Sequence, residues 1–247
     1  PHDPATVWVG IEPSAVYRST DGGETWTATA DLTTLPSADR WSFPPRLHTH
    51  HVRWIEPDPA DGERLYVGIE AGALVITDDA GASWGDRPRG SRRDNHSLAT
   101  HPDAPGRVYA AAGDGFAESM DGGETWAHSQ TGLDHRYCWS VVPDPADPDR
   151  VLLSAASGPR MAHSQPGESY VYRRDGGLPW ERAMTGLPGP EGLLRAVLAP
   201  ATAPGNVIVL SNHGLYQTAD FGDTWEPIPV EWPERFQRQP PRGLVFV

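Results

Sequence analysis

The sequence predicts an all-β protein made of short strands and tight turns. Glycine and proline account for 26 residues each among 247, and ten tryptophans are present, a composition typical of many short strands joined by turns. No stretch carries apolar residues at the spacing of a helix face, and no apolar run reaches the length of a membrane span. An eight-residue box also recurs along the chain, which indicates a repeat architecture.

The recurring box has the form S/T-x-D-x-G-x-S/T-W. A degenerate copy, "RRDGGLPW", keeps only Asp175, Gly177 and Trp180 of this pattern. The aspartate carboxylate can accept backbone N–H groups inside the turn, and the glycine adopts a positive φ at low cost. Asp21, in the first box, is therefore expected to form a turn and not to act as a catalytic acid. The complete copies span residues 19–26, 77–84, 119–126 and 218–225, and the degenerate copy spans 173–180.

These boxes resemble those of the Asp-box, or BNR-repeat, family of β-propellers in the sialidase-like superfamily, and the resemblance covers essentially the whole chain. That family includes sialidases, the sortilin ectodomain and photosystem II assembly factors, so the resemblance implies either an enzyme or a binding protein. The sialidase catalytic motifs are missing, because the chain has no Arg-Ile-Pro sequence to open an arginine triad. Five blades would also misplace such a triad.

A second repeated unit accompanies the boxes and consists of an apolar strand, a Pro/Asp turn and another strand, as in "VRWIEPDPADGERLYVGIE". The box tryptophans recur at similar intervals, and the interval from Trp225 through both chain ends to Trp26 has the same size. We therefore predict one domain over 1–247, a five-bladed β-propeller of four-stranded antiparallel blades, with the C-terminal strand joining the N-terminal blade to close the ring. Six or more blades is the alternative if the sequence is truncated. The predicted blades cover approximately 1–29 plus 242–247, 50–87, 95–129, 136–184 and 193–229.

The long connections are predicted to lie on the face opposite the boxes. They cover residues 27–51, 157–169 and 229–242, and seven of the ten histidines fall on this face. Long loops on one side of a rigid scaffold are where binding and catalytic sites are usually built. The alternative is that these segments are connectors without a function.

The candidate site follows from an alignment of the inner strands on their prolines. This alignment places His51, His96, Tyr137, Leu194 and Arg242 at one level of the ring. The predicted catalytic residues are His51, His96, His135, Glu70 and Tyr137. The predicted substrate-binding residues are Glu12, Asp114, Arg195, Arg242, His213, Trp41 and Trp232, and the predicted metal ligands are His50, His51 and His96.

These residue types indicate acid–base or metal chemistry. A histidine paired with a carboxylate can act as a general base, a second histidine or Tyr137 as a general acid, and Arg195 or Arg242 can hold an anionic group. Neutral imidazoles also bind divalent transition metals, which makes such an ion the candidate cofactor. We expect a hydrolase or lyase acting on a small polar or anionic substrate in an axial pocket. The alternative is a non-enzymatic scaffold that binds a protein partner on the long-loop face.

Charge and composition exclude several other functions. The net charge of −13 argues against a nucleic-acid partner, and the absence of lysine excludes Schiff-base chemistry. Cys138 stands alone in an apolar run and is expected in the core. The chain begins "PHDPATVWVG", without a signal sequence, so we expect a soluble cytoplasmic protein, or a secreted one if a signal was removed, with no membrane partner.

Overall fold

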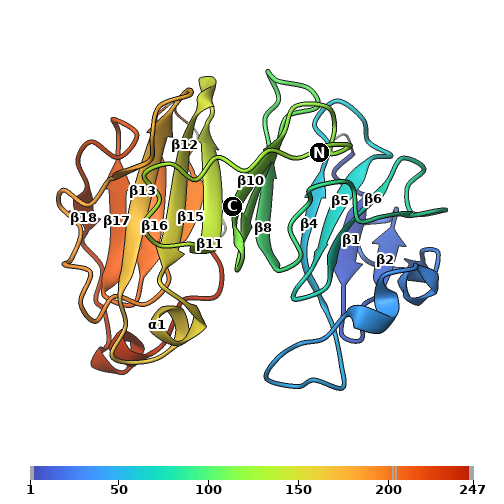
Figure 1. The fold of residues 1–247 in the computed structure, drawn as a ribbon, viewed down its shortest axis with the longest axis horizontal. Helices are drawn as coiled ribbons and strands as arrows, with labels where there is room; N and C mark the ends of the chain where they lie inside the picture. Colours follow the sequence, from blue (N-terminus) through green and yellow to red (C-terminus); the bar gives the residue numbers. More distant parts are fainter. Residues whose placement is uncertain (1–2, 202, 204, 245–247) are drawn as a thin grey trace. The chain divides into compact units, whose positions relative to one another are not determined.

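The structure is a computed structural model that describes residues 3–201, 203 and 205–244. It is all-β, with five antiparallel sheets that follow one another along the chain (Figure 1). Each sheet is one blade of a β-propeller, which confirms the predicted fold class. The first three sheets contain β1 (Val7–Gly10), β2 (Val16–Ser19) and β3 (Thr27–Ala28); β4 (Val52–Pro57), β5 (Leu65–Ile69), β6 (Ala73–Thr77) and β7 (Gly85–Asp86); and β8 (Asn95–Thr100), β9 (Val108–Ala112) and β10 (Gly115–Ser119).

The last two sheets have four strands each, and helical structure is confined to single turns in the connections. These sheets contain β11 (Tyr137–Asp144), β12 (Asp147–Ala156), β13 (Ser169–Asp175) and β14 (Glu181–Arg182); and β15 (Val197–Pro200), β16 (Val207–Ser211), β17 (Gly214–Thr218) and β18 (Glu226–Ile228). The helical turns are η1 (Leu32–Thr34), η2 (Ala38–Arg40), α1 (Pro159–His163) and η3 (Glu234–Arg238). None of the described helices is long and apolar enough to span a membrane.

The chain divides into two compact units. One comprises residues 1–112 and 117–128, and the other comprises 113–116 and 129–247. The single-domain assignment and the blade boundaries stay predictions.

Two sheets have three strands where four were predicted. In the third sheet the outermost segment forms only an isolated bridge between Glu118 and Ala127. In the first sheet, the predicted fourth strand over 242–247 lies partly outside the described residues, and residues 242–244 are not in a strand. Closure of the ring by that strand stays a prediction.

The box is a hydrogen-bonded turn, as predicted. In the third copy, Ser119 Oγ donates to Asp121 Oδ1 over 2.7 Å and accepts from Gly123 N over 2.8 Å. Asp121 Oδ1 accepts from Thr125 N over 2.9 Å, and Trp126 Nε1 donates to the Gly123 carbonyl over 2.9 Å. Gly123 has φ +87°, a conformation that only glycine adopts without strain. The box aspartates are therefore structural.

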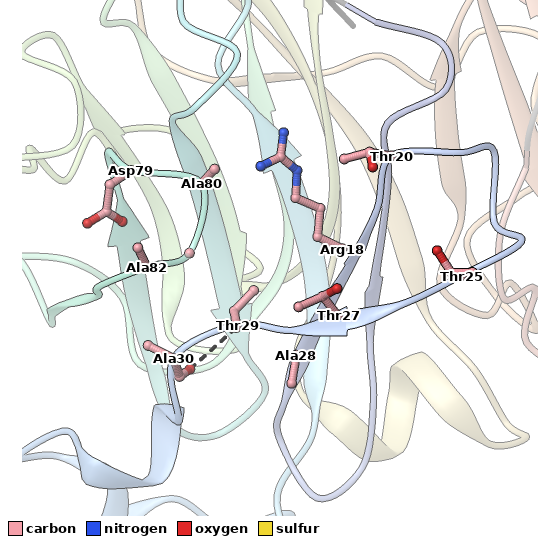
Figure 2. A pocket seen from close by; sticks show the side chains of 11 residues that line it. Arg18, Thr20, Thr25, Thr27, Ala28, Thr29, Ala30, Asp79, Ala80 and Ala82 are labelled. Atoms are coloured by element: carbon pink, nitrogen blue, oxygen red, sulfur yellow. Dashed lines mark hydrogen bonds between the residues drawn. The ribbon is translucent and has the colours of Figure 1, made fainter.

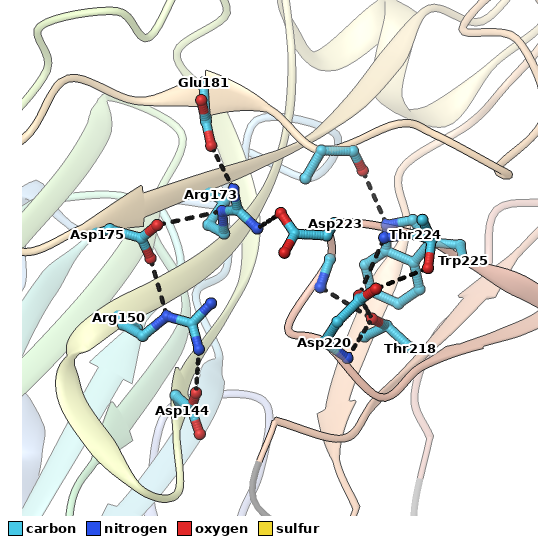
Figure 3. Close-up of polar contacts among 12 residues, drawn as sticks. Asp144, Arg150, Arg173, Asp175, Glu181, Thr218, Asp220, Asp223, Thr224 and Trp225 are labelled. Atoms are coloured by element: carbon cyan, nitrogen blue, oxygen red, sulfur yellow. Dashed lines mark hydrogen bonds and ion pairs between the residues drawn. The ribbon is translucent and has the colours of Figure 1, made fainter.

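The degenerate box has Arg173 and Pro179 at the two hydroxyl positions, and its aspartate, Asp175, is paired with arginines (Figure 3). Asp175 accepts from Arg150 Nε over 3.0 Å and lies 3.5 Å from Arg173 Nε. Arg150 also donates to Asp144 over 3.0 Å, and Arg173 pairs with Asp223 of the next box. This ion-pair network joins two consecutive blades on the box side.

Strands β5 and β9 are buried on both faces, and successive residues of such a strand pack against different neighbouring sheets. In β5, Val67 belongs to an apolar cluster with Val16 of the preceding sheet, whereas Tyr66 belongs to a cluster with Leu98 of the following sheet. This alternation follows from the two-residue period of a strand. Each fully buried aliphatic side chain contributes roughly 1.5–3 kcal/mol to stability.

Three of the connections between sheets carry a glycine that lies close to the backbone of the next box tryptophan. A Cβ added at any of these glycines would lie 2.8 Å or less from the tryptophan carbonyl oxygen, and all three have φ between +81° and +94°. This contact could not be predicted from the sequence, because it joins segments 36 to 48 residues apart. The three pairs are Gly90 with Trp126, Gly132 with Trp180, and Gly186 with Trp225.

Candidate functional site

A histidine and a glutamate predicted to be catalytic meet at the end of the first hairpin of the second sheet. His51 precedes β4, Glu70 follows β5, and the two strands pair in antiparallel register, so the two residues are cross-strand neighbours. Glu70 N donates to the His51 carbonyl over 3.3 Å, and His51 Nε2 lies 3.0 Å from Glu70 Oε2. Arg53 Nε is 3.5 Å from the same oxygen. The hairpin therefore places an imidazole and a guanidinium beside one carboxylate.

The next inner strand adds a second histidine and a second carboxylate. His96 is fully buried, and its Nε2 lies 3.7 Å from Asp94 Oδ1. The pairing of β8 with β9 shifts register between Asn95 and Ser97, so His96 is the extra residue of a β-bulge. Bulges of this kind redirect a side chain and are frequent next to active sites. The bulge gives His96 an orientation that a regular strand would not give it.

Two tight contacts hold these segments together. Ala71, with φ +49°, directs its backbone N–H to Asp94 Oδ1 over 2.8 Å, and Gly72 N donates to the Arg93 carbonyl over 3.0 Å. At Gly68 an added Cβ would lie 2.9 Å from Asn95 Cβ, so the absence of a side chain allows β8 to approach β5. The turn that carries Glu70 is thus fixed to the strand that carries His96.

The electrostatics of this cluster favour an ionised Glu70. Burial alone would raise the pKa of its carboxyl group, but the hydrogen bond from His51 and the nearby His96, His51 and Arg53 outweigh burial, and the pKa is lowered. The Glu70 and His51 side chains are 13% and 16% exposed, so both are largely buried but keep a small accessible surface. We call His51, Glu70, Asp94 and His96 the His/carboxylate cluster.

The long connection before β4 supports His51 through aromatic contacts. The Phe43 ring meets the His51 ring edge-on at 4.6 Å between centroids, and Trp41 meets His50 in the same way at 5.5 Å. His50 Nδ1 accepts from Ser14 N over 3.2 Å, and burial followed by the nearby His51 lowers the pKa of His50. His50 is held as a structural side chain in this arrangement.

Trp41, predicted to bind substrate, lies in the core instead. It is 6% exposed, its Nε1 donates to Ser37 Oγ over 2.8 Å, and its ring belongs to the apolar cluster around Val67. The turns η1 and η2 fold the connection back against the sheet and bury the ring. Glu12, also predicted to bind substrate, is paired with Arg46 on the surface, and its role stays a prediction.

In the second unit, Tyr137 and Arg195 meet at one histidine. Tyr137 Oη lies 2.9 Å from His163 Nε2, and Arg195 contacts His163 Nδ1 while its guanidinium stacks 3.9 Å from the Trp139 ring. Trp139 lies at the register shift of β11, the equivalent of the His96 bulge in β8. His163, which comes from α1, was not among the predicted site residues.

His135 lies in a neighbouring aromatic group of the same unit. Its Nδ1 is 2.6 Å from Tyr172 Oη, and its ring stacks on Tyr170 at 4.4 Å. Tyr170 Oη donates to Glu168 over 2.7 Å, and the hydrogen bond to Glu168 is the main reason that the pKa of Tyr170 is raised to about 12. Burial lowers the pKa of His135 and so favours the neutral imidazole.

The long connection over residues 229–242 is anchored by Asn212. Its side chain accepts from Leu194 N over 2.9 Å and donates to the carbonyls of Gly192 and Gln237 over 3.0 and 2.7 Å. The Asn212 carbonyl accepts from Trp232 Nε1 over 2.8 Å. Trp232 therefore serves to dock this segment.

The remaining predicted binding residues are His213, Asp114 and Arg242. His213 Nε2 is 3.4 Å from the Gly192 carbonyl, and Asp114 and Arg242 are exposed. Convergence of all the predicted residues on one axial pocket stays a prediction.

The proline-based alignment of the inner strands was wrong by two residues in the third sheet. Pro57 and Pro143 lie inside β4 and β11, whereas Pro102 lies beyond the end of β8 at Thr100. The shared register shifts instead align His96 with Arg53 and Trp139. By the same comparison Asp94, and not His96, is equivalent to His51 and Tyr137. For this reason Asp94 and Arg53 were absent from the predicted site.

A pocket of about 390 Å³ lies away from the His/carboxylate cluster, on the box side of the first two blades (Figure 2). It is lined by Arg18, by the threonines around β3 and by the second box from Asp79 to Ala82. None of the predicted catalytic residues lines it. Because the box aspartate is used in its own turn, this pocket offers little chemistry, and we place the candidate site at the cluster.

Comparisons with known proteins identify the repeat and the fold. Residues 17–28 match the family model described as BNR/Asp-box repeat, and no curated protein matches the chain. The structure of a GH74 enzyme from Niastella koreensis is 17% identical, with a TM-score of 0.71 over 97% of this chain and 37% of that one. YCF48 bound to D1 peptide is 15% identical, with a TM-score of 0.55 over 94% of this chain and 67% of that one.

A third similar structure, from a nidogen/laminin complex, is 10% identical, with a TM-score of 0.56 over 88% of this chain and 75% of that one. The chain spans about a third of the length of the GH74 structures that it matches. At these identities the likeness shows the fold alone. The chain is a five-bladed β-propeller built on Asp-box (BNR) repeats.

Proposed function

We propose that the chain is an enzyme, a hydrolase or a lyase, that acts on a small polar or anionic substrate at the His/carboxylate cluster. The observation that carries the proposal is the meeting of two imidazoles and two carboxylates from three separate segments. His51, Glu70 and His96 were selected from sequence, and their closeness in the structure supports a shared task. Such groups can exchange protons with a substrate or hold an ion that polarises it.

The fold does not decide between catalysis and binding. Similar structures include GH74 enzymes and also YCF48 with a D1 peptide and a nidogen/laminin complex. Support for catalysis comes from the cluster itself, because a histidine held beside a carboxylate can take a proton from a substrate and return it. Arg53 beside Glu70 also places a guanidinium at the edge of the cluster, where it can donate hydrogen bonds to a polar substrate group.

A substrate panel tests the proposal. The wild-type protein is assayed on chromogenic esters, glycosides and phosphates for hydrolysis, and on uronides for the ultraviolet absorbance of an elimination product. We expect turnover of at least one class. The Glu70→Gln substitution, which keeps an oxygen to accept from His51, should lower kcat/KM by about 100-fold or more.

The matched control is Glu63→Gln, at the opposite end of the same hairpin, where the side chain is exposed. It should leave kcat/KM unchanged, and circular dichroism should show that both variants fold. Absence of turnover on every class, or full activity in Glu70→Gln, would contradict the proposal and favour a protein-binding scaffold.

A further inference from the structure

The His/carboxylate cluster contains the donor set of a metal site. Among the described residues, ligand atoms of Glu70, Asp94 and His96 lie within 4.8 Å of one another. Three atoms at such separations have a common point within about 2.8 Å of each, by plane geometry. Metal–ligand bonds to imidazole and carboxylate are roughly 2.0–2.2 Å. Inward movements of less than about 1 Å, within reach of side-chain rotation, would therefore close the site.

Each of the three ligands is already oriented by a second contact. Glu70 is held by His51 over 3.0 Å, Asp94 accepts from Ala71 N over 2.8 Å, and His96 is turned by the β8 bulge. Hydrogen bonds to ligating carboxylates are a regular feature of metal centres and contribute to affinity. The ligands also come from two sheets of one unit, which makes the site rigid.

The charges and donor types indicate which ion would fit. Arg53 lies beside Glu70, and a dication at the meeting point of Glu70 and Asp94 would be held by two carboxylates. Calcium prefers six to eight oxygen ligands, whereas an imidazole donor favours first-row transition metals. The Asp94 side chain is 29% exposed, which leaves a route for the ion and for a ligand.

We propose that Glu70, Asp94 and His96 bind one divalent transition-metal ion, with His51 as the residue that positions Glu70. This inference deepens the proposed function, because the bound ion would polarise the substrate or its attacking water. The metal set differs from the one predicted from sequence, since Glu70 and Asp94 take the places of His50 and His51.

The experiment measures metal binding without any substrate. Full-length protein without a histidine tag is stripped with chelator and titrated with Zn²⁺ by calorimetry and with Co²⁺ by visible absorption. We expect one ion per chain and Co²⁺ bands of a nitrogen- and oxygen-coordinated site. Asp94→Asn, which retains an oxygen to accept from Ala71 N, and Glu70→Gln should each weaken binding by about tenfold or more.

The controls are Asp103→Asn, beyond the opposite end of β8, and Glu63→Gln; both residues are exposed and both variants should bind as the wild type does. No binding of either ion, or equal affinity in wild type, Asp94→Asn and Glu70→Gln, would overturn the metal site. The outcome is separate from that of the substrate panel, because a chain could turn over substrate without a metal or bind metal without turnover.

Discussion

Gly186 provides a test of how the connections between blades are packed. It has φ +94°, and a Cβ added to it would lie 2.0 Å from the Trp225 carbonyl oxygen and 2.9 Å from the carbonyl carbon. Trp225 N donates to the Thr185 carbonyl over 2.8 Å, so the same contact joins the connection to the box. Replacement of Gly186 by alanine should separate the two segments.

The cost can be estimated from these distances. An oxygen at 2.0 Å must move by at least about 1 Å before it reaches an observed Cβ contact, which would break the hydrogen bond from Trp225 N. The left-handed backbone costs alanine about 1–3 kcal/mol, and the lost hydrogen bond adds about 1 kcal/mol. Gly186→Ala should therefore destabilise the protein by about 3 kcal/mol and lower Tm by about 6–12 °C.

Thermal unfolding followed by circular dichroism measures this shift. The control is Gly177→Ala, in the same unit, because an added Cβ at Gly177 would meet nothing within 4 Å. The control should stay within about 0.5 kcal/mol of the wild type. Equal Tm values for Gly186→Ala and Gly177→Ala would refute the packing argument.

Three further predictions concern stability. Hydrogen bonds from Thr125 lower the pKa of Asp121 from 3.8 to about 2, so the stabilisation by the ionised carboxylate is present above pH 3.8 and is lost as the pH falls through 2. Asp121→Asn should lower the free energy of unfolding at neutral pH by about 1 kcal/mol. In urea titrations the variant should also lose less stability on acidification than the wild type does. Burial raises the pKa of Glu56 from 4.5 to about 7 despite the hydrogen bond from Trp54. The protonated Glu56 therefore stabilises the fold below pH 4.5, and about 3 kcal/mol of the free energy of unfolding is lost as the pH rises through 7. Urea midpoints at pH 5 and pH 8 should show this loss in the wild type and not in Glu56→Gln. Asn212→Ala removes three hydrogen bonds and should cost about 2 kcal/mol, with faster proteolysis between residues 229 and 244; unchanged cleavage would contradict the anchoring role.

The blades could be predicted from the sequence because the box is a local motif. Its hydrogen bonds join residues two to four positions apart, so the sequence pattern contains all of the partners. The fixed order of strand, turn and box then determines where each sheet lies along the chain. The degenerate copy was recognisable through Asp175 and Trp180, although its stabilising arginines were not.

The site was predictable only in part, because it depends on long-range register. His51, Glu70 and His96 were selected and do meet, whereas Asp94 and Arg53 were missed. Their positions follow from β-bulges in β4 and β8, which the residue pattern does not reveal. Trp41 was predicted to bind substrate because it lies in a long connection, and the three-residue helical turns that bury it are too short to show a periodic residue pattern.

The most direct test of the proposed site is where a substrate binds. We suggest a crystal structure of the Glu70→Gln variant with a compound that the wild type turns over. We expect the reacting group to lie within hydrogen-bonding distance of the side chain at position 70, of Asp94 or of His96. Electron density for the compound on the box side, in the pocket beside Arg18 and Asp79, would contradict it.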